Sequence, residues 1–409
     1  MTLATRIYLT GGIRSFTTGA VGVLLGLYLA RLNVAPGAVG LIVGAGLAGG
    51  AVATMVVAMA AERLGRRRVL MIVTALGGAG LGAAVLAASP VVLGLAAFFG
   101  MVNGMGRDRG AAQTLEQSVL ADEVTDGVRT GVFSRYALIQ DLAGALGALA
   151  SAVPAGLEWL GGLAGVPAYR ATFLALAIVS LLPIAIYAGL GSFGLPTGTG
   201  ATNGRLRVPL GAASRRRVRA LAGLFALDSV GGGFLAGSIL SYWFFRQFGL
   251  SGQALGLVFF AARGLNAASY LVAERLAGRI GLVRTMVFTH LPSSAILLAL
   301  PFVGNAWLAI LLFLLRESLV QMDVPTRQSY VAAVTGPGER TFALGVTGVV
   351  RNAGWAVGPP LAGQAMAAWG LGAPLVLGAV TKIVYDLALY GAFRRIRPPE
   401  EQNGAARAA

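Results

Sequence analysis

Long apolar segments alternate with short polar connections along the whole chain. A bilayer core of about 30 Å requires about 20 consecutive apolar residues in a helix. Residues 38–60 and 171–190 meet this requirement without any charge. The pattern predicts an all-α membrane protein, because lipid-exposed backbone must satisfy its own hydrogen bonds. Twelve transmembrane helices are predicted, at residues 7–30, 37–61, 69–88, 91–121, 130–153, 170–190, 219–245, 253–274, 285–303, 306–334, 342–367 and 373–393.

The composition of the 409 residues favours the same class. Hydrophobic residues make up 56% and charged residues 12%, whereas a soluble protein has about 25% charged residues. So few charges cannot cover a water-facing surface. The absence of cysteine and the single histidine exclude disulfides and multi-histidine metal sites. We therefore expect no metal ion and no cofactor.

Arginines concentrate in alternate connections between the predicted spans. Four lie between residues 63 and 68, six between residues 205 and 219, and three between residues 394 and 397. The positive-inside rule then places both termini in the cytoplasm and predicts a multi-pass protein of the cell (inner) membrane. This asymmetry also accounts for the net charge of +16, which faces anionic lipid. We do not expect nucleic-acid binding.

A polar stretch rich in Pro, Gly and Thr separates six spans from six. We predict an N-terminal six-helix bundle over residues 1–193 and a cytoplasmic linker over residues 194–217. A C-terminal six-helix bundle follows over residues 218–397, and residues 398–409 form a disordered tail. One duplicated bundle needs no partner, so we expect a monomer.

The two halves are related by an internal repeat. Residues 61–64 recur at residues 273–276, an offset of about 212. At similar offsets Arg14 matches Asp228, and the stretch around Glu116 matches that around Arg327. The repeat predicts two pseudo-symmetric six-helix bundles, an organisation that suits alternating access with a substrate held between them.

A short motif connects the second and third spans. It reads Glu62-Arg63-Leu64-Gly65-Arg66-Arg67 and has a weaker copy at residues 274–279. The motif resembles the D-R-x-G-R-R signature of the major facilitator superfamily, with Glu62 in place of Asp. The sequence Gly358-Pro359-Pro360 in the eleventh span also fits that family. The resemblance covers essentially the whole chain and implies a 12-helix secondary transporter.

The resemblance also implies a function for these connections and leaves the subfamily open. The fifth span lacks the G-P-x-x-G-G motif that is typical of drug/proton antiporters. A cytoplasmic gate is implied, in which charged side chains pair in one state and separate in the other. The alternative is a set of basic loops that only fixes topology. The implied gate residues are Glu62, Arg63, Arg67, Glu274 and Arg275.

Ionisable side chains at membrane depth are costly and are therefore functional candidates. They concentrate on spans 1, 4, 7 and 10, which line the central cavity in the family's fold. Arg109 and Glu116 are spaced to share one helical face. The repeat exchanges charge signs, which suggests that cations of one half meet anions of the other half or of the substrate. The substrate-cavity candidates are Arg14, Arg109, Arg316, Asp323 and Arg327.

Glu116 and Asp228 are the candidates for proton coupling. Desolvation and neighbouring charges together determine when a buried carboxyl group binds a proton. The alternative for each is a structural ion pair, for Glu116 with Arg109 or Arg14. We interpret Asp323 and Arg327 as a fixed pair, because they are four residues apart.

Five further charged or titratable residues are interpreted as structural. Arg107 and Asp108 point away from the predicted face of the fourth span. Lys382 and Asp386, four residues apart, suggest an internal ion pair. A lone histidine such as His290 is more often a hydrogen-bonded structural residue than a titrating one.

Three functions follow from these residues. The first is a proton-coupled exporter of a small amphipathic compound. The second is an importer or exchanger of an anionic metabolite, because arginine side chains suit carboxylate and phosphate groups. The third is a membrane sensor that no longer transports. Nothing in the sequence supports an enzyme, because it contains no nucleophile–base pair and no nucleotide-binding loop.

Overall fold

The computed structural model describes residues 2–87, 89–123, 126–190, 212–333 and 340–394. Within these ranges regular structure is entirely helical, which confirms the predicted all-α class. The helices are α1 (Leu3–Arg31), α2 (Pro36–Leu64), α3 (Arg66–Leu86), α4 (Pro90–Phe99), α5 (Ala111–Glu123), α6 (Asp126–Leu149), η1 (Ala150–Ala152), α7 (Val153–Gly161), α8 (Val166–Ala188), α9 (Ala212–Gly233), α10 (Gly237–Phe248), α11 (Gly252–Ile280), α12 (Leu282–Ala299), η2 (Leu300–Phe302), α13 (Ala306–Val320), α14 (Asp323–Ala333), α15 (Arg340–Trp369) and α16 (Ala373–Phe393).

The helices follow the twelve predicted transmembrane spans, with the fourth and the tenth each divided into two helices. Among the described residues, nine helical segments are long and apolar enough to cross a membrane. The other three spans correspond to α4 with α5, α13 with α14, and α15. Large apolar side chains face outward, as a lipid environment requires; Leu86, Val91 and Trp307 are 79%, 72% and 80% exposed. These helices therefore present apolar side chains where a soluble protein presents polar ones.

The helices form two compact units. The first contains α1 to α8, α10, the start of α11 up to Phe260 and the end of α15 from Pro359. The second contains α9, the rest of α11, α12 to α14, α15 up to Gly358, and α16. The domain boundaries expected from the sequence follow the repeat instead, and they stay a prediction. Residues 194–211 and 398–409 lie outside the described residues.

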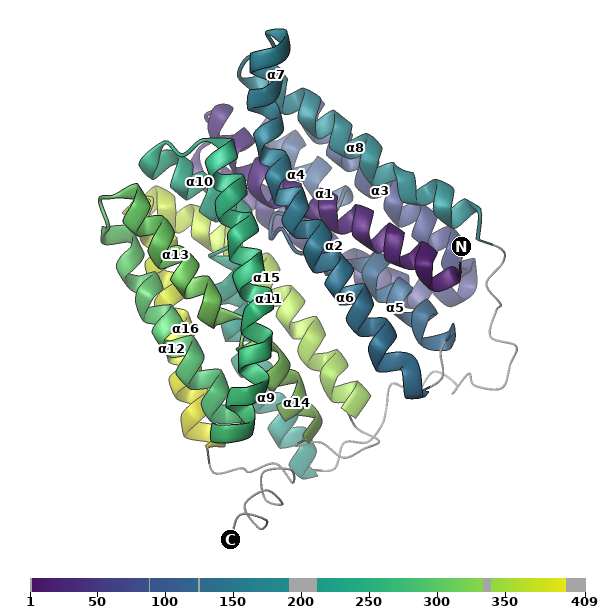
Figure 1. Ribbon diagram of the computed structural model, residues 1–409, viewed down its shortest axis with the longest axis vertical. Helices are drawn as coiled ribbons and strands as arrows, with labels where there is room; N and C mark the ends of the chain where they lie inside the picture. The colour runs from purple at the N-terminus through teal and green to yellow at the C-terminus, as the bar shows by residue number, and fades with distance from the viewer. Residues whose placement is uncertain (1, 88, 124–125, 191–211, 334–339, 395–409) are drawn as a thin grey trace. The chain divides into compact units, whose positions relative to one another are not determined.

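Helix α1 is the central helix of the first unit. It packs against α6, α8 and α10 (Figure 1). A Cβ atom on Gly19 of α1 would overlap the backbone at Gly144, and one on Gly147 of α6 would overlap the backbone at Phe16. Glycine is therefore required where α1 and α6 cross, because any side chain would push the two backbones apart.

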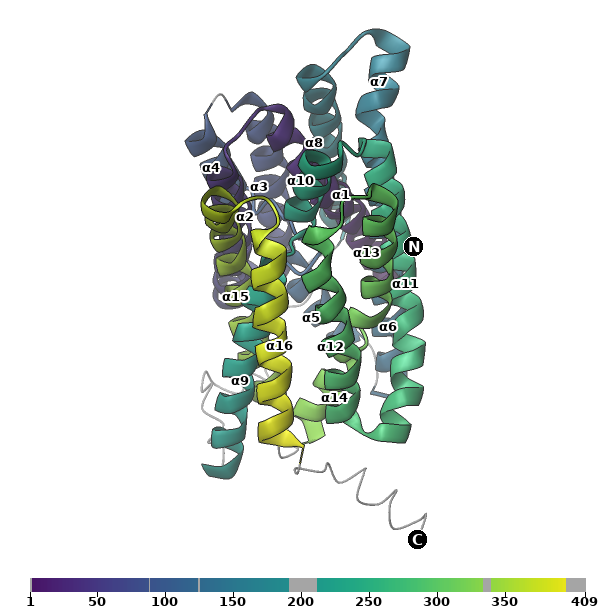
Figure 2. The same ribbon diagram turned by 90° about the vertical axis from the view of Figure 1, so that its left-hand side faces the viewer.

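Helices α12 and α16 organise the second unit. Helix α16, yellow in Figure 2, packs against α12 and α9, and α12 also packs against α13 and α14. The buried core between them includes Phe225, Met286, Tyr330, Tyr385 and Phe393. This arrangement brings side chains from α9, α12, α14 and α16 together.

The same tight turn occurs once in each half of the chain. Gly65, with φ of 84°, joins α2 to α3, and Gly281, with φ of 88°, joins α11 to α12. Positive φ favours glycine because it lacks a Cβ atom. The matching turns agree with the internal repeat in the sequence.

Candidate functional site

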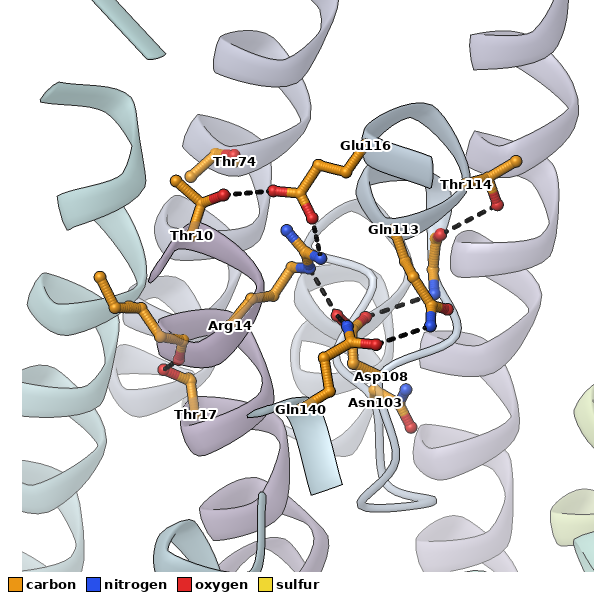
Figure 3. Close-up of polar contacts among 12 residues, drawn as sticks. Thr10, Arg14, Thr17, Thr74, Asn103, Asp108, Gln113, Thr114, Glu116 and Gln140 are labelled. Atoms are coloured by element: carbon orange, nitrogen blue, oxygen red, sulfur yellow. Dashed lines mark hydrogen bonds and ion pairs between the residues drawn. The ribbon is translucent and has the colours of Figure 1, made fainter. Parts of the chain in front are cut away.

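Arg14 of α1 lies at the centre of a polar network in the first unit. Its Nε donates to Oδ2 of Asp108 at 2.6 Å, and a terminal nitrogen donates to Oε2 of Glu116 at 2.7 Å. Figure 3 shows the guanidinium between the two carboxylates. The Arg14 side chain is 19% exposed, whereas that of Glu116 is fully buried. One guanidinium therefore contacts two carboxylates through charge-assisted hydrogen bonds.

Three hydroxyl groups also donate to Glu116. Tyr136 of α6 donates to Oε2 at 2.6 Å, while Tyr187 of α8 and Thr10 of α1 donate to Oε1. A buried carboxylate is costly unless its lone pairs are satisfied. These donors, together with Arg14, therefore account for the complete burial of Glu116 on α5.

Gln140 of α6 extends this network. Its Nε2 donates to Oδ2 of Asp108 at 3.2 Å and to the Tyr136 hydroxyl at 3.3 Å. Its Oε1 accepts from Gln113 at 3.0 Å. We define the first network as Thr10, Arg14, Asp108, Glu116, Tyr136, Gln140 and Tyr187.

The fourth predicted span is interrupted at membrane depth. Residues 100–110 lie between α4 and α5 and are not helical. The Asn103 side chain donates to the Arg107 carbonyl at 2.7 Å and accepts from the Met105 N–H at 2.9 Å. Such irregular backbone is tolerated within a membrane only where it is buried in protein or lines a water-filled cavity.

This interruption corrects two expectations from the sequence. The predicted shared helical face of Arg109 and Glu116 is wrong, because Arg109 precedes the start of α5. Asp108, expected to point away from the site, contacts Arg14 directly. The signal was present in the sequence, because Asn and Gly at positions 103, 104, 106 and 110 are typical of a turn.

Asp228 of α9 is the centre of a polar network in the second unit. Its Oδ1 accepts from Nζ of Lys382 at 2.8 Å, and its Oδ2 accepts from Arg327 at 3.1 Å. Arg351 lies 3.7 Å from the same Oδ2. Arg327 also donates to Asp323 at 2.8 Å, so the expected fixed pair is present.

Lys382 and Asp386 do not form the expected pair with each other. Lys382 contacts Asp228, whereas both carboxylate oxygens of Asp386 lie 2.9 Å from Nδ1 of His290. Spacing along one helix does not reveal partners on neighbouring helices, which explains the error. We define the second network as Asp228, His290, Asp323, Arg327, Arg351, Lys382 and Asp386.

Each network contains an ion pair between an arginine and a carboxylate. Between the two networks, the positive and the negative residue exchange positions in the repeat. Arg14 pairs with Glu116 in the first network, and Asp228 pairs with Arg327 in the second. These positions correspond in the repeat. Among the described residues these charges pair within each unit. The expected meeting of cations of one half with anions of the other half or of the substrate stays a prediction.

Two cavity candidates, Arg109 and Arg316, are outside both networks as defined. Arg316 pairs with Glu317, which accepts from Nδ2 of Asn266 at 2.9 Å. Helix α13 ends at Val320 and α14 begins at Asp323, so Arg316 lies on a different helix from Asp323 and Arg327.

The implied gate residues have different surroundings. Arg67 donates to the Ala188 carbonyl at the end of α8, at 2.7 Å, and Arg6 donates to the Gly189 carbonyl at 2.7 Å. Cations suit a helix C-terminus because its last carbonyls carry partial negative charge. Arg63 and Arg275 are exposed. The side chains of Glu62 and Glu274 lie outside the described part of the structure.

Comparison with known proteins agrees with this architecture. The family model described as Major Facilitator Superfamily matches residues 7–316 and, in a second match, residues 221–409. The chain belongs to the major facilitator superfamily. Membership identifies it as a multi-pass membrane transporter, a class of proteins that bind small-molecule substrates.

The similar proteins include one relative without a stated substrate and solved structures of transporters for different substrates. An uncharacterized membrane protein of Saccharomyces cerevisiae, YJR124C, is 25% identical over 389 residues, covering 86% of this chain and 85% of that protein. A mutant of the nucleoside transporter NupG matches with a TM-score of 0.77 and 12% identity, covering 96% of this chain and 100% of that one. A D-xylose-proton symporter matches with a TM-score of 0.69 and 14% identity, covering 95% and 98%. At such identities the solved structures establish the fold alone.

Proposed function

We propose that the chain is a proton-coupled secondary transporter of the cytoplasmic membrane that exports a small amphipathic compound. Glu116 carries the proposal. It is a fully buried carboxylate that accepts hydrogen bonds from side chains on α1, α6 and α8. Proton binding to Glu116 would remove one of the two negative charges that hold Arg14 and change the packing of those helices.

The surroundings of the arginines support an amphipathic substrate rather than an anionic one. Arg14, Arg316 and Arg327 each form an ion pair with a carboxylate of their own unit. Their charge is therefore already compensated, which weakens the case for an arginine-lined anion site. The proposal thus favours efflux over the exchange of an anionic metabolite.

The proposed orientation places both termini in the cytoplasm. Its support is the arginine asymmetry of the sequence, including Arg63 to Arg68 in the α2–α3 connection. The chain contains no cysteine, so single cysteines can report orientation. A cysteine at Ala35 should react with a membrane-impermeant maleimide from outside the cell, and one at Arg279, an exposed residue at the end of α11, should not. The opposite pattern would contradict the orientation.

Coupling is tested in proteoliposomes with an imposed proton gradient. Glu116→Gln and Asp228→Asn should each reduce uphill accumulation on the order of tenfold or more, with substrate binding largely retained. Glu158→Gln is the matched control, because Glu158 is an exposed carboxylate on α7 that caps the Gly165 N–H. Full uphill transport in both network variants would refute the coupling role.

Substrate class is tested by thermal stabilisation, because ligands that bind the folded state raise its melting temperature. The panels are lipophilic cations, carboxylate or phosphate metabolites, and neutral nucleosides and xylose. We expect stabilisation by lipophilic cations that is lost in Glu116→Gln. Stabilisation by anions that is lost in Arg14→Ala or Arg327→Ala would establish the anion carrier instead.

A further inference from the structure

The only histidine and the only lysine of the chain contact each other. Nζ of Lys382 on α16 lies 3.4 Å from Nε2 of His290 on α12. Both side chains are buried, with exposed fractions of 7% and 2%. A membrane interior rarely contains either residue without a functional reason.

The partners of His290 define its protonation. Asp386 only accepts hydrogen bonds when ionised, so Nδ1 of His290, at 2.9 Å from both carboxylate oxygens, carries a proton. The Lys382 ammonium only donates, so Nε2 presents its lone pair. The contacts therefore fit a neutral imidazole with its proton on Nδ1.

With a neutral imidazole the second network is balanced in charge. It then contains three carboxylates, on Asp228, Asp323 and Asp386, and three cations, on Arg327, Arg351 and Lys382. One further proton on His290 leaves a net positive charge among buried groups. An uncompensated buried charge is costly, so the charged network favours an arrangement with more access to water.

Lys382 and His290 face the same oxygen atom. Nζ of Lys382 lies 2.8 Å from Oδ1 of Asp228, and Nε2 of His290 lies 3.9 Å from it. Once Nε2 is protonated it becomes a donor and repels the ammonium group. Oδ1 of Asp228 is then the acceptor within reach of the imidazole.

We propose that His290 is a proton-binding site. Its protonation changes the partner of Oδ1 of Asp228, which then accepts a hydrogen bond from the imidazole in place of Lys382. The imidazole gains one proton at Nε2, and no other covalent bond changes. The inference rests on the proposed proton coupling and supplies the second network with the group that binds the proton. Asp228 serves as the acceptor that changes partner.

The charged groups on neighbouring helices are consistent with this assignment. From α16 the imidazole faces Asp386, Lys382 and the Tyr385 ring, which lies at right angles to it, and from α9 it faces Asp228. The charges of α14 and α15 reach His290 only through Asp228, which Arg327 and Arg351 contact. The charges of α13, on Arg316 and Glu317, pair with each other.

Asp228 itself is poorly suited to bind the proton. Lys382, Arg327 and Arg351 all lie within ion-pair distance of its two oxygens. Protonation of this carboxylate would leave three cations facing one another. The His290 imidazole accepts a proton without losing the negative charge that these cations share.

Because His290 is the only histidine, its titration can be observed directly. The full chain, purified in nanodiscs through a tag that contains neither histidine nor lysine, is labelled on histidine and lysine with ¹³C and ¹⁵N. NMR spectra are recorded from about pH 5 to about pH 9. We expect Nδ1 to be protonated throughout, Nε2 to gain a proton in one step, and the Lys382 side-chain resonances to shift in that same step.

A neutral imidazole over the whole range, or a titration that leaves Lys382 unchanged, would overturn the proposal. Asp386→Asn should allow the other tautomer, because an amide both donates and accepts. Tyr385→Phe is the matched control and should keep the proton on Nδ1, because it retains the aromatic ring that packs at right angles to the imidazole. The proton is the only ligand in this experiment. If transport proves independent of a proton gradient while both resonances still move together, the coupling fails and the proton site stands.

Discussion

The first and second networks occupy corresponding positions in the repeat but distribute charge in opposite ways. In the first, the single cation Arg14 lies between Asp108 and Glu116, and hydroxyl groups supply the other donors. In the second, Asp228 contacts Arg327, Arg351 and Lys382. The pair Arg14–Glu116 thus corresponds to Asp228–Arg327 with the signs exchanged.

This difference shows that a duplicated membrane bundle can keep the attraction between two buried charges without keeping the sign at each position. Coulomb attraction depends on the product of two charges, so a pair can exchange signs and keep its attraction. The groups around the pair must differ, however. Loss of one cation should destabilise a carboxylate surrounded by hydroxyl groups to a different extent from a carboxylate that contacts three cations.

Removal of Arg14 should have the largest effect on stability. Arg14→Met removes the guanidinium that contacts both Asp108 and Glu116 and should lower the free energy of unfolding by about 3–5 kcal/mol. Thermal unfolding in detergent measures the change. Arg170→Met, at an exposed arginine on α8, is the control and should change it by less than about 0.5 kcal/mol. Equal stability of the two variants would mean that Arg14 does not hold the first network together.

Loss of a hydroxyl donor should have the next largest effect. Tyr136→Phe removes a hydrogen bond to Glu116 and should cost about 1.5–3 kcal/mol, the usual range for bonds to charged groups. Tyr28→Phe is the matched control, because the Tyr28 hydroxyl is equally buried and has no hydrogen-bond partner among the described residues. A similar loss in both variants would show that hydroxyl donors do not distinguish the first network.

The two central carboxylates should differ in what their neutralisation costs. Asp228→Asn leaves its three cations with less negative charge, whereas Glu116→Gln leaves Arg14 paired with Asp108. We expect Asp228→Asn to be more destabilising by about 1–2 kcal/mol, the scale of one partly compensated buried charge. Denaturation of both variants under the same conditions gives the difference. A reversed order would contradict the charge distribution described for the networks.

The α8 cap should have the smallest effect. Arg67→Gln weakens the bond to the Ala188 carbonyl and should cost about 0.3–1 kcal/mol, the usual contribution of a cation at a helix C-terminus. Arg68→Gln, at the neighbouring exposed arginine, should be neutral. Equal unfolding midpoints for Arg67→Gln and the unchanged protein would exclude a stabilising contact at this position.

The sequence predicted the helices far better than their interruptions. Hydrophobic length identifies a membrane span because the bilayer has a fixed thickness. The break between α4 and α5 depends on local polar bonds, such as those of Asn103 to the Arg107 carbonyl and the Met105 N–H. A window averaged over twenty residues conceals such a break.

The sequence identified the central charged residues of the site but was less successful at predicting which residues contact each other. The concentration of charge on four spans identified Arg14, Glu116, Asp228 and Arg327. It did not identify Tyr136 or Tyr187, because a tyrosine in an apolar span looks like core packing. The spacing of Lys382 and Asp386 suggested a pair, yet each contacts another helix. Contacts between helices arise from packing, which periodicity along one helix does not encode.

The interrupted fourth span has a consequence for how the protein enters the membrane. At 1.5 Å per residue, the ten residues of α4 and the thirteen of α5 extend about 15 Å and about 20 Å. Neither spans a hydrocarbon core of about 30 Å by itself. The segment between them carries Arg107, Asp108 and Arg109, whose partition from the translocon into lipid is unfavourable by about 2.5–3.5 kcal/mol each at the centre of a span.

Asp108 pairs with Arg14 on α1, which is synthesised about ninety residues earlier. We therefore expect stable insertion of the fourth span to depend on the first span being held nearby until the two meet. On this expectation biogenesis of the transporter is cooperative, and Arg14 retains a segment that lipid alone would not.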